Sequence, residues 1–124
     1  MTNILFALLG GALGAAGRYG IATLVQRQSA GIFPWGTLAV NALGSFCIGI
    51  LWHILEQSDA SAGLRIFLVV GLLGGFTTFS AFSMETFNLI RDGAFKLAFL
   101  NVMISNILCI GLASAGYLLA RWLA

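Results

Sequence analysis

The stretch GGFTTFSAFSME, residues 74–85, decides the fold of this chain, because it interrupts a long apolar segment. It contains two glycines, four hydroxyl side chains and three phenylalanines in twelve positions. Glycine weakens a helix, and a hydroxyl in the hydrocarbon core of a bilayer costs free energy unless another protein group satisfies it. If this segment lies in a membrane, another part of the protein must compensate for that cost.

Composition identifies the chain as a membrane protein. Of its 124 residues, 60% are hydrophobic and 8% are charged, whereas a soluble domain has about 25% charged residues. Four apolar stretches have about the 20 residues that a transmembrane helix needs, and they are residues 4–25, 37–55, 66–90 and 97–119. We therefore predict an all-α integral membrane protein with four transmembrane helices, in a single domain that covers residues 1–124.

One alternative for the first stretch is a cleaved signal peptide, because the small residues of GALGAAG, residues 11–17, follow an apolar run. No Lys or Arg precedes that run, however, and hydrophobicity resumes after Arg18. A signal peptide begins with a positively charged region and ends at its cleavage site. The pattern therefore favours a retained first helix.

Positive charges are nearly balanced between the two sides of the predicted bundle. Four crossings place both termini and the loop of residues 56–65 on one side. The basic residues are Arg65 and Arg121 on that side, and Arg27, Arg91 and Lys96 on the other. Lys and Arg in short loops set the orientation of a membrane protein, so this small difference predicts insertion in both orientations. Such a population can form an antiparallel homodimer.

Glycine motifs for close helix contact occur on two of the predicted helices. They are Gly10-xxx-Gly14 on the first and Gly71-xxx-Gly75 on the third. Small residues at this spacing let two helix backbones approach each other closely. The motifs are compatible either with packing inside one subunit or with a contact between two subunits, and the charge balance favours a homodimer.

Neutral side chains follow helical spacing along two of the apolar stretches. They are Thr37, Asn41 and Ser45 on the second stretch, and Asn101, Ser105 and Cys109 on the fourth. Each set lies on one helix face, where it can serve as hydrogen-bonding glue between helices or line a path. No Asp, Glu, His or Lys lies near the centre of any stretch. A path lined by neutral hydrogen-bond donors suits an anion or a small polar solute.

Arg18 and a phenylalanine pair complete the set of candidates. Arg18 lies about two thirds of the way along the first stretch, where it either anchors the helix end or attracts anions into a vestibule. Phe79 and Phe82 are three residues apart, with Ser80 between them, and their rings point the same way on a helix. The pair is either ordinary packing or an anion contact, since an aromatic ring has a positive edge.

Other functions need features that differ from these. A small multidrug exporter also has four helices of this length, but it requires a carboxylate within the membrane, and the first stretch has none. A membrane scaffold protein would use the polar stripes only for packing. We do not expect an enzyme, because the sequence has no nucleophile with a base, metal cluster or phosphate loop.

Three motifs together resemble the Fluc family of fluoride channels, also known as CrcB proteins. They are GGALGAAGRYG at 10–20, GTLAVNALGSFCIG at 36–49 and GLLGGFTTFSAFSME at 71–85, in the order that the family has. The resemblance implies a channel that passes fluoride passively down its gradient and so lowers cytoplasmic fluoride. It also implies a multi-pass protein of the bacterial inner membrane, with fluoride, membrane lipid and a second copy of the chain as partners, and no nucleic acid.

The resemblance further implies a third helix that is broken within the membrane, an antiparallel dual-topology homodimer, and roles for particular residues. The pore residues would be Asn41, Phe79, Ser80, Phe82 and Ser105. Arg18 would lie near a vestibule. The broken helix would hold a structural Na+ at the dimer interface through the backbone carbonyls of Gly74 and Thr77, because carbonyls freed at membrane depth must be satisfied.

Two positions depart from the family pattern. The fourth helix of the family often has a tyrosine four residues before a pore serine, and here Asn101 precedes Ser105. The third motif commonly reads TFSTFS, and here Ala81 replaces the second threonine. The first difference concerns one end of the pore, and the second removes a hydroxyl.

Overall fold

The computed structural model describes all 124 residues, Met1–Ala124, and every regular element in it is helical. The elements are α1 (Thr2–Gln28), α2 (Trp35–Glu56), α3 (Ala62–Arg65), η1 (Ile66–Leu73), α4 (Gly74–Phe76), α5 (Phe79–Arg91) and α6 (Phe95–Leu123). Four segments are long and apolar enough to cross a membrane, and Ala62–Arg91 is the third of them. This confirms the predicted multi-pass membrane protein with a broken third helix. Each apolar stretch lies inside one of these segments.

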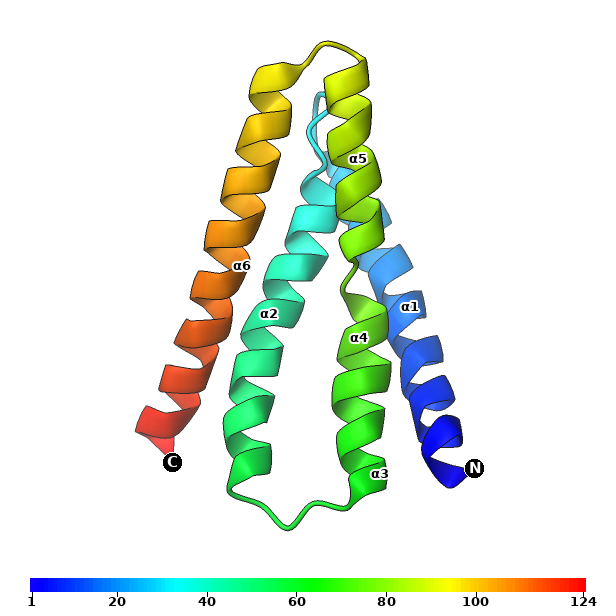
Figure 1. Ribbon diagram of the computed structural model, residues 1–124, viewed down its shortest axis with the longest axis vertical. Coiled ribbons are helices and arrows are strands. Elements are labelled where there is room, and N and C mark those ends of the chain that lie inside the picture. The colour runs from blue at the N-terminus through cyan, green and yellow to red at the C-terminus, as the bar shows by residue number, and fades with distance from the viewer.

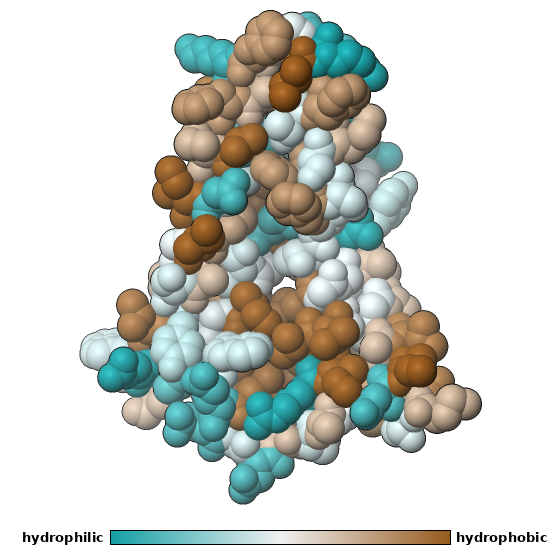
Figure 2. Space-filling model, viewed as in Figure 1, coloured by the Kyte–Doolittle hydropathy of each residue, from teal (hydrophilic) through white to brown (hydrophobic).

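The chain passes four times along the long axis of the molecule (Figure 1). Both termini and the connection from α2 to α3 lie at one end, and the turn from α5 to α6 lies at the other (Figure 1). α2 packs mainly against α6, and α1 packs mainly against η1 and α4. Figure 2 shows hydrophilic residues gathered at both ends and hydrophobic residues over much of the sides between them, as a bilayer requires.

Two polar side chains close the connections between helices. Gln26 of α1 donates from Nε2 to the carbonyl oxygen of Phe33 (3.1 Å) and accepts from the N–H of Gly36 at Oε1 (3.0 Å). At the opposite end, Arg65 donates from Nη2 to the carbonyl oxygen of Leu55 (2.6 Å). Helix ends leave backbone groups without intrahelical partners, and these side chains supply partners that also fix the helices relative to one another.

Glycines bring the backbone of α1 into contact with the third segment. A Cβ added at Gly71 would lie 2.8 Å from the Cα of Gly10, and one at Gly75 would lie 2.8 Å from the carbonyl oxygen of Gly11. A Cβ at Gly14 would overlap a backbone carbonyl of η1. Both glycine motifs of the sequence therefore pack against each other inside one chain, which decides between the two alternatives that the sequence left open.

The third segment departs from α-helical geometry in two places. Ile66–Leu73 forms a π-helical stretch, which is not apparent from the residue pattern. Further along, Thr77 (φ −91°, ψ 158°) and Thr78 (φ −150°, ψ 117°) are extended, and a new helix begins at Phe79. We call Thr77–Thr78 the break. Extended residues cannot continue the backbone hydrogen-bond ladder of a helix, so the break leaves backbone groups that need other partners at membrane depth.

Candidate functional site

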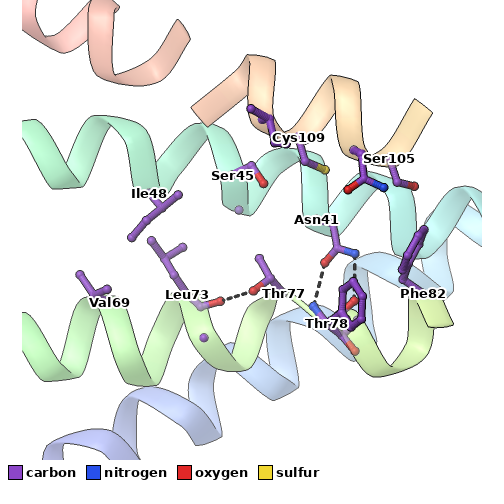
Figure 3. A pocket seen from close by; sticks show the side chains of 15 residues that line it. Asn41, Ser45, Ile48, Val69, Leu73, Thr77, Thr78, Phe82, Ser105 and Cys109 are labelled. Carbon is purple, nitrogen blue, oxygen red and sulfur yellow. Dashed lines mark hydrogen bonds between the residues drawn. The ribbon is translucent and has the colours of Figure 1, made fainter. Parts of the chain in front are cut away.

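An open cavity of about 430 Å³ lies beside the break, between α2, the third segment and α6. Fifteen residues line it, and none of them is acidic or basic. Its polar residues and one cysteine are Asn41, Ser45, Thr77, Thr78, Ser105, Asn106 and Cys109, several of which are labelled in Figure 3. Amide and hydroxyl groups can donate hydrogen bonds to an anion without a fixed positive charge.

Asn41 connects α2 to the break through two hydrogen bonds. Its Nδ2 donates to the carbonyl oxygen of Thr78 (3.0 Å), and its Oδ1 accepts from the N–H of Thr78 (2.7 Å), as Figure 3 shows. The amide therefore satisfies both backbone groups of one extended residue, as a neighbouring strand would. One of the two amide hydrogens of Asn41 is left for another acceptor.

The threonine hydroxyls of the break also bond to the backbone of their own segment. Thr77 donates from Oγ1 to the carbonyl oxygen of Leu73 (3.0 Å). Thr78 is the N-cap of α5, since its Oγ1 accepts from the N–H of Ala81 (3.1 Å), and it lies 3.2 Å from the hydroxyl of Ser80. These contacts end one helix and begin the next, so that α5 starts directly at Phe79.

Phe79 and Phe82 both lie in the first turn of α5 and both line the cavity. Their ring centroids are 5.4 Å apart, and the ring planes are inclined by 46°. Phe79 is 76% exposed in the single chain. One chain therefore leaves this ring, and the side of the cavity next to it, uncovered.

Arg18 of α1 bonds to the short helix α4, which precedes the break. Its Nε donates to the carbonyl oxygen of Gly75 in α4 (3.0 Å), and it does not line the cavity. A cationic side chain stabilises the last carbonyls of a helix. Arg18 of α1 thus holds the helix before the break, and Asn41 of α2 holds the break itself. A vestibule role for Arg18 stays a prediction.

The carbonyls of Gly74 and Thr77 lack the hydrogen bonds that a continuous helix would give them. The N–H of Thr78, four residues after Gly74, donates to Asn41 instead. The N–H of Ala81, four residues after Thr77, donates to the Thr78 hydroxyl. Gly74 and Thr77 both line the cavity. Carbonyl oxygens of this kind are ligands that a hard cation accepts.

Behind the cavity, a chain of hydrogen bonds joins α6 to α5. Ser105 donates from Oγ to Oδ1 of Asn101 (3.2 Å), and Asn101 donates from Nδ2 to Oγ1 of Thr86 (2.9 Å). Thr86 in turn donates to the carbonyl oxygen of Phe82 (2.8 Å). Asn101 is only 1% exposed and does not line the cavity. It lies in the core, directly behind Ser105.

The structure brings most of the predicted pore residues to one cavity. Asn41, Phe79, Phe82 and Ser105 line it, and Ser80 does not. Asn106 also lines the cavity and was not among the predicted residues, although an amide in an apolar stretch is itself a signal. Thr86 was not predicted either, although its hydroxyl lies in an apolar stretch, because the Asn101 amide that bonds to it comes from another helix.

Comparisons with known proteins agree with one another. The profile of a family described as CrcB-like protein, Camphor Resistance (CrcB), matches residues 5–117. A protein of Parabacteroides distasonis named fluoride-specific ion channel FluC is 45% identical over 98% of this chain and 94% of its own length. Proteins with the same name from Geobacter sulfurreducens and Magnetococcus marinus are 48% and 44% identical, over 99% and 96% of this chain and 100% and 98% of their own lengths.

Proposed function

This chain belongs to the CrcB family, and we propose that it is a fluoride channel, which passes fluoride passively down its gradient. The observation that carries the proposal is the cavity at the break, which is lined by neutral polar groups and two phenylalanines and by no charged side chain. Relatives that bear the name of fluoride channels cover nearly the whole chain. The family is one of ion channels, which are not enzymes.

The cavity suits a small anion that holds its water strongly. Donors must replace the water that fluoride loses, yet no group should bind it so firmly that it cannot leave. The free amide hydrogen of Asn41 and the ring edges of Phe79 and Phe82 are such groups, and none carries a full charge. Ser105 adds a hydroxyl to the same wall. We place Ser80 in the same path, from its exposed position beside Thr78.

A second copy of the chain would complete the path. The cavity is open, and Phe79 is 76% exposed beside it, so a single chain does not enclose an ion. The two ends of the molecule differ by only one basic residue, which permits insertion in both orientations. We therefore propose an antiparallel homodimer with dual topology in the inner membrane of a bacterium, in which Arg18 lies near the vestibule.

We also propose that the carbonyls of Gly74 and Thr77 hold a structural Na+ where the two breaks meet. Both carbonyls lack their usual helical partners, and two copies of the chain would provide four oxygens. A bound cation would neutralise the carbonyl dipoles there. Exchange of Na+ for the bulky cation N-methylglucamine should then shift the protein from dimer to monomer in light scattering, and an unchanged dimer would contradict the site.

Flux from liposomes tests the channel function. Purified protein in liposomes loaded with fluoride or chloride should release fluoride rapidly and chloride hardly at all, as read by ion-selective electrodes. Phe79→Ile and Phe82→Ile should lower fluoride release without loss of folded protein. Phe99→Ile is the matched control, because Phe99 is an exposed ring on α6 that does not line the cavity. An absence of fluoride release by the unaltered protein would refute the proposal.

A further inference from the structure

The hydrogen-bond chain behind the cavity has a direction. Ser105 donates to Asn101, Asn101 donates to Thr86, and Thr86 donates to the carbonyl of Phe82. The Ser105 proton is therefore taken up by Asn101 and is not offered to the cavity. In this arrangement Ser105 offers only oxygen lone pairs to the cavity that it lines. An anion there needs the opposite, because it binds hydrogen-bond donors.

The same four groups can also form the chain in the reverse direction. The Asn101 amide has an oxygen and a nitrogen of nearly equal shape, so turning it by half a rotation exchanges acceptor and donor. Nδ2 then donates to Oγ of Ser105, and the Thr86 hydroxyl turns from Phe82 to Oδ1 of Asn101. The Ser105 proton is now free to point into the cavity. The carbonyl of Phe82 lies inside α5, where a helical N–H still serves it.

In either direction of the hydrogen bonds, every polar side-chain atom of Ser105, Asn101 and Thr86 has a partner. The first has three hydrogen bonds that end on the Phe82 carbonyl, and the second has three that end on the anion. This balance matters because Asn101 is 1% exposed and Ser105 is 8% exposed, and unpaired polar atoms are costly at such burial. A leucine at position 101 could neither accept nor donate, and an ionised aspartate could only accept.

We propose that Asn101 is a positioning residue for permeation, which reverses its amide so that Ser105 can donate its proton to fluoride in the cavity. The inference rests on the proposed channel function. Asn101 does not touch the ion; it acts through Ser105, with Thr86 as the group that accommodates either direction. Ser105 switches between donor and acceptor as the ion arrives and leaves, so fluoride is not held too firmly.

The test is a mutant cycle on single-channel fluoride current in planar bilayers. Asn101→Leu and Ser105→Ala should each lower the current about three- to tenfold, which corresponds to the loss of one hydrogen bond. The double variant should conduct like Ser105→Ala alone, because an amide without a serine hydroxyl has nothing to orient. Current through one channel does not depend on how much protein folds, so a purely structural role of Asn101 would not produce this result.

Ser114→Ala is the matched control, since Ser114 does not line this cavity and its hydroxyl donates only to the carbonyl of Ile110, within α6 (2.9 Å). Its current should be unchanged. If Asn101→Leu does not insert, Asn101→Asp replaces it; an ionised carboxylate would hold the Ser105 proton and lower the current at least as far as Ser105→Ala. Asn101→Leu could lower the current by the same factor in the Ser105→Ala variant as in the unaltered protein, or not lower it at all. Either result would contradict the role of Asn101 and leave the channel function standing. If the unaltered protein carries no fluoride current, both the channel function and the role of Asn101 are refuted.

Discussion

The third segment is held in two different ways along its length. At η1, glycines of α1 and of the segment let the two backbones touch, and the contact needs no side-chain hydrogen bond. At the break and just before it, side chains from α2 and α1 extend to backbone groups, as Asn41 does to Thr78 and Arg18 to Gly75. An intact helix satisfies its own backbone, so its neighbour need only fit against it. A broken helix requires polar groups from its neighbours.

The two kinds of contact also determine different things. Contact between backbones sets how closely two helices approach, because atoms that touch cannot come nearer. Hydrogen bonds to the break set where one residue lies and how it is rotated, because they depend on angle as well as distance. The cavity lies next to the hydrogen bonds at the break, and Asn41 and Thr78 form part of its wall. Four substitutions separate the two contributions.

The largest effect should come from Gly14→Val, in the glycine contact. A Cβ there would overlap the carbonyl of Leu72 and lie 2.9 Å from the backbone nitrogen of Phe76. Backbone atoms cannot move aside as a flexible side chain can, so we expect a loss of more than about 3 kcal/mol in the free energy of unfolding. The measurement is SDS titration followed by far-ultraviolet circular dichroism. Gly11→Val is the control, because a Cβ there meets nothing within 4 Å; equal losses would show that the contact is not tight.

Asn41→Leu should have the next largest effect, because it removes the partner of both backbone groups of Thr78. Leaving two such groups unpaired should cost about 2 to 4 kcal/mol in the same titration. Asn106→Leu is the matched control for stability, since the Asn106 amide donates only to the Val102 carbonyl of its own helix. A loss no larger than that of the control would mean that the break holds its shape without Asn41.

A smaller loss, about 1.5 kcal/mol, should follow from Arg18→Met, which keeps the apolar stem and removes one charge-assisted hydrogen bond. The Gly75 carbonyl that Arg18 serves is a single group, whereas Asn41 serves two. Arg27→Met, on the same helix, replaces an exposed arginine with no hydrogen bond or ion pair in the structure. Indistinguishable unfolding curves for these two variants would place the function of Arg18 elsewhere, such as in a vestibule.

The smallest effect should come from Thr78→Val, which keeps the shape of the side chain and removes the N-cap of α5. Loss of an N-cap hydroxyl costs about 1 kcal/mol. Asn41 should still hold position 78, because it bonds to the backbone and not to the hydroxyl. Thr78→Ser retains the capping oxygen and should unfold like the unaltered protein; if it unfolds like Thr78→Val, the cap is not what stabilises α5.

Much of this organisation is predictable from residue types alone. The apolar stretches predict the four crossings, since a bilayer admits few other structures. Helical spacing also brings Asn41 and Ser45 of one stripe, and Ser105 and Cys109 of another, to the same cavity. The stripe logic does not extend to Asn101, which turns into the core. Spacing gives the face of a helix and not the neighbour that the face meets.

The sequence by itself determined how many times the chain crosses the membrane, that its crossings are helices, and that polar groups concentrate near residues 74–85. Those properties follow from the local cost of placing each residue in hydrocarbon. Only the tertiary structure decided which group meets which: Asn41 with the Thr78 backbone, and Asn101 with Thr86. Such pairs depend on the depth and rotation of helices relative to one another, and these emerge only when all four segments pack together.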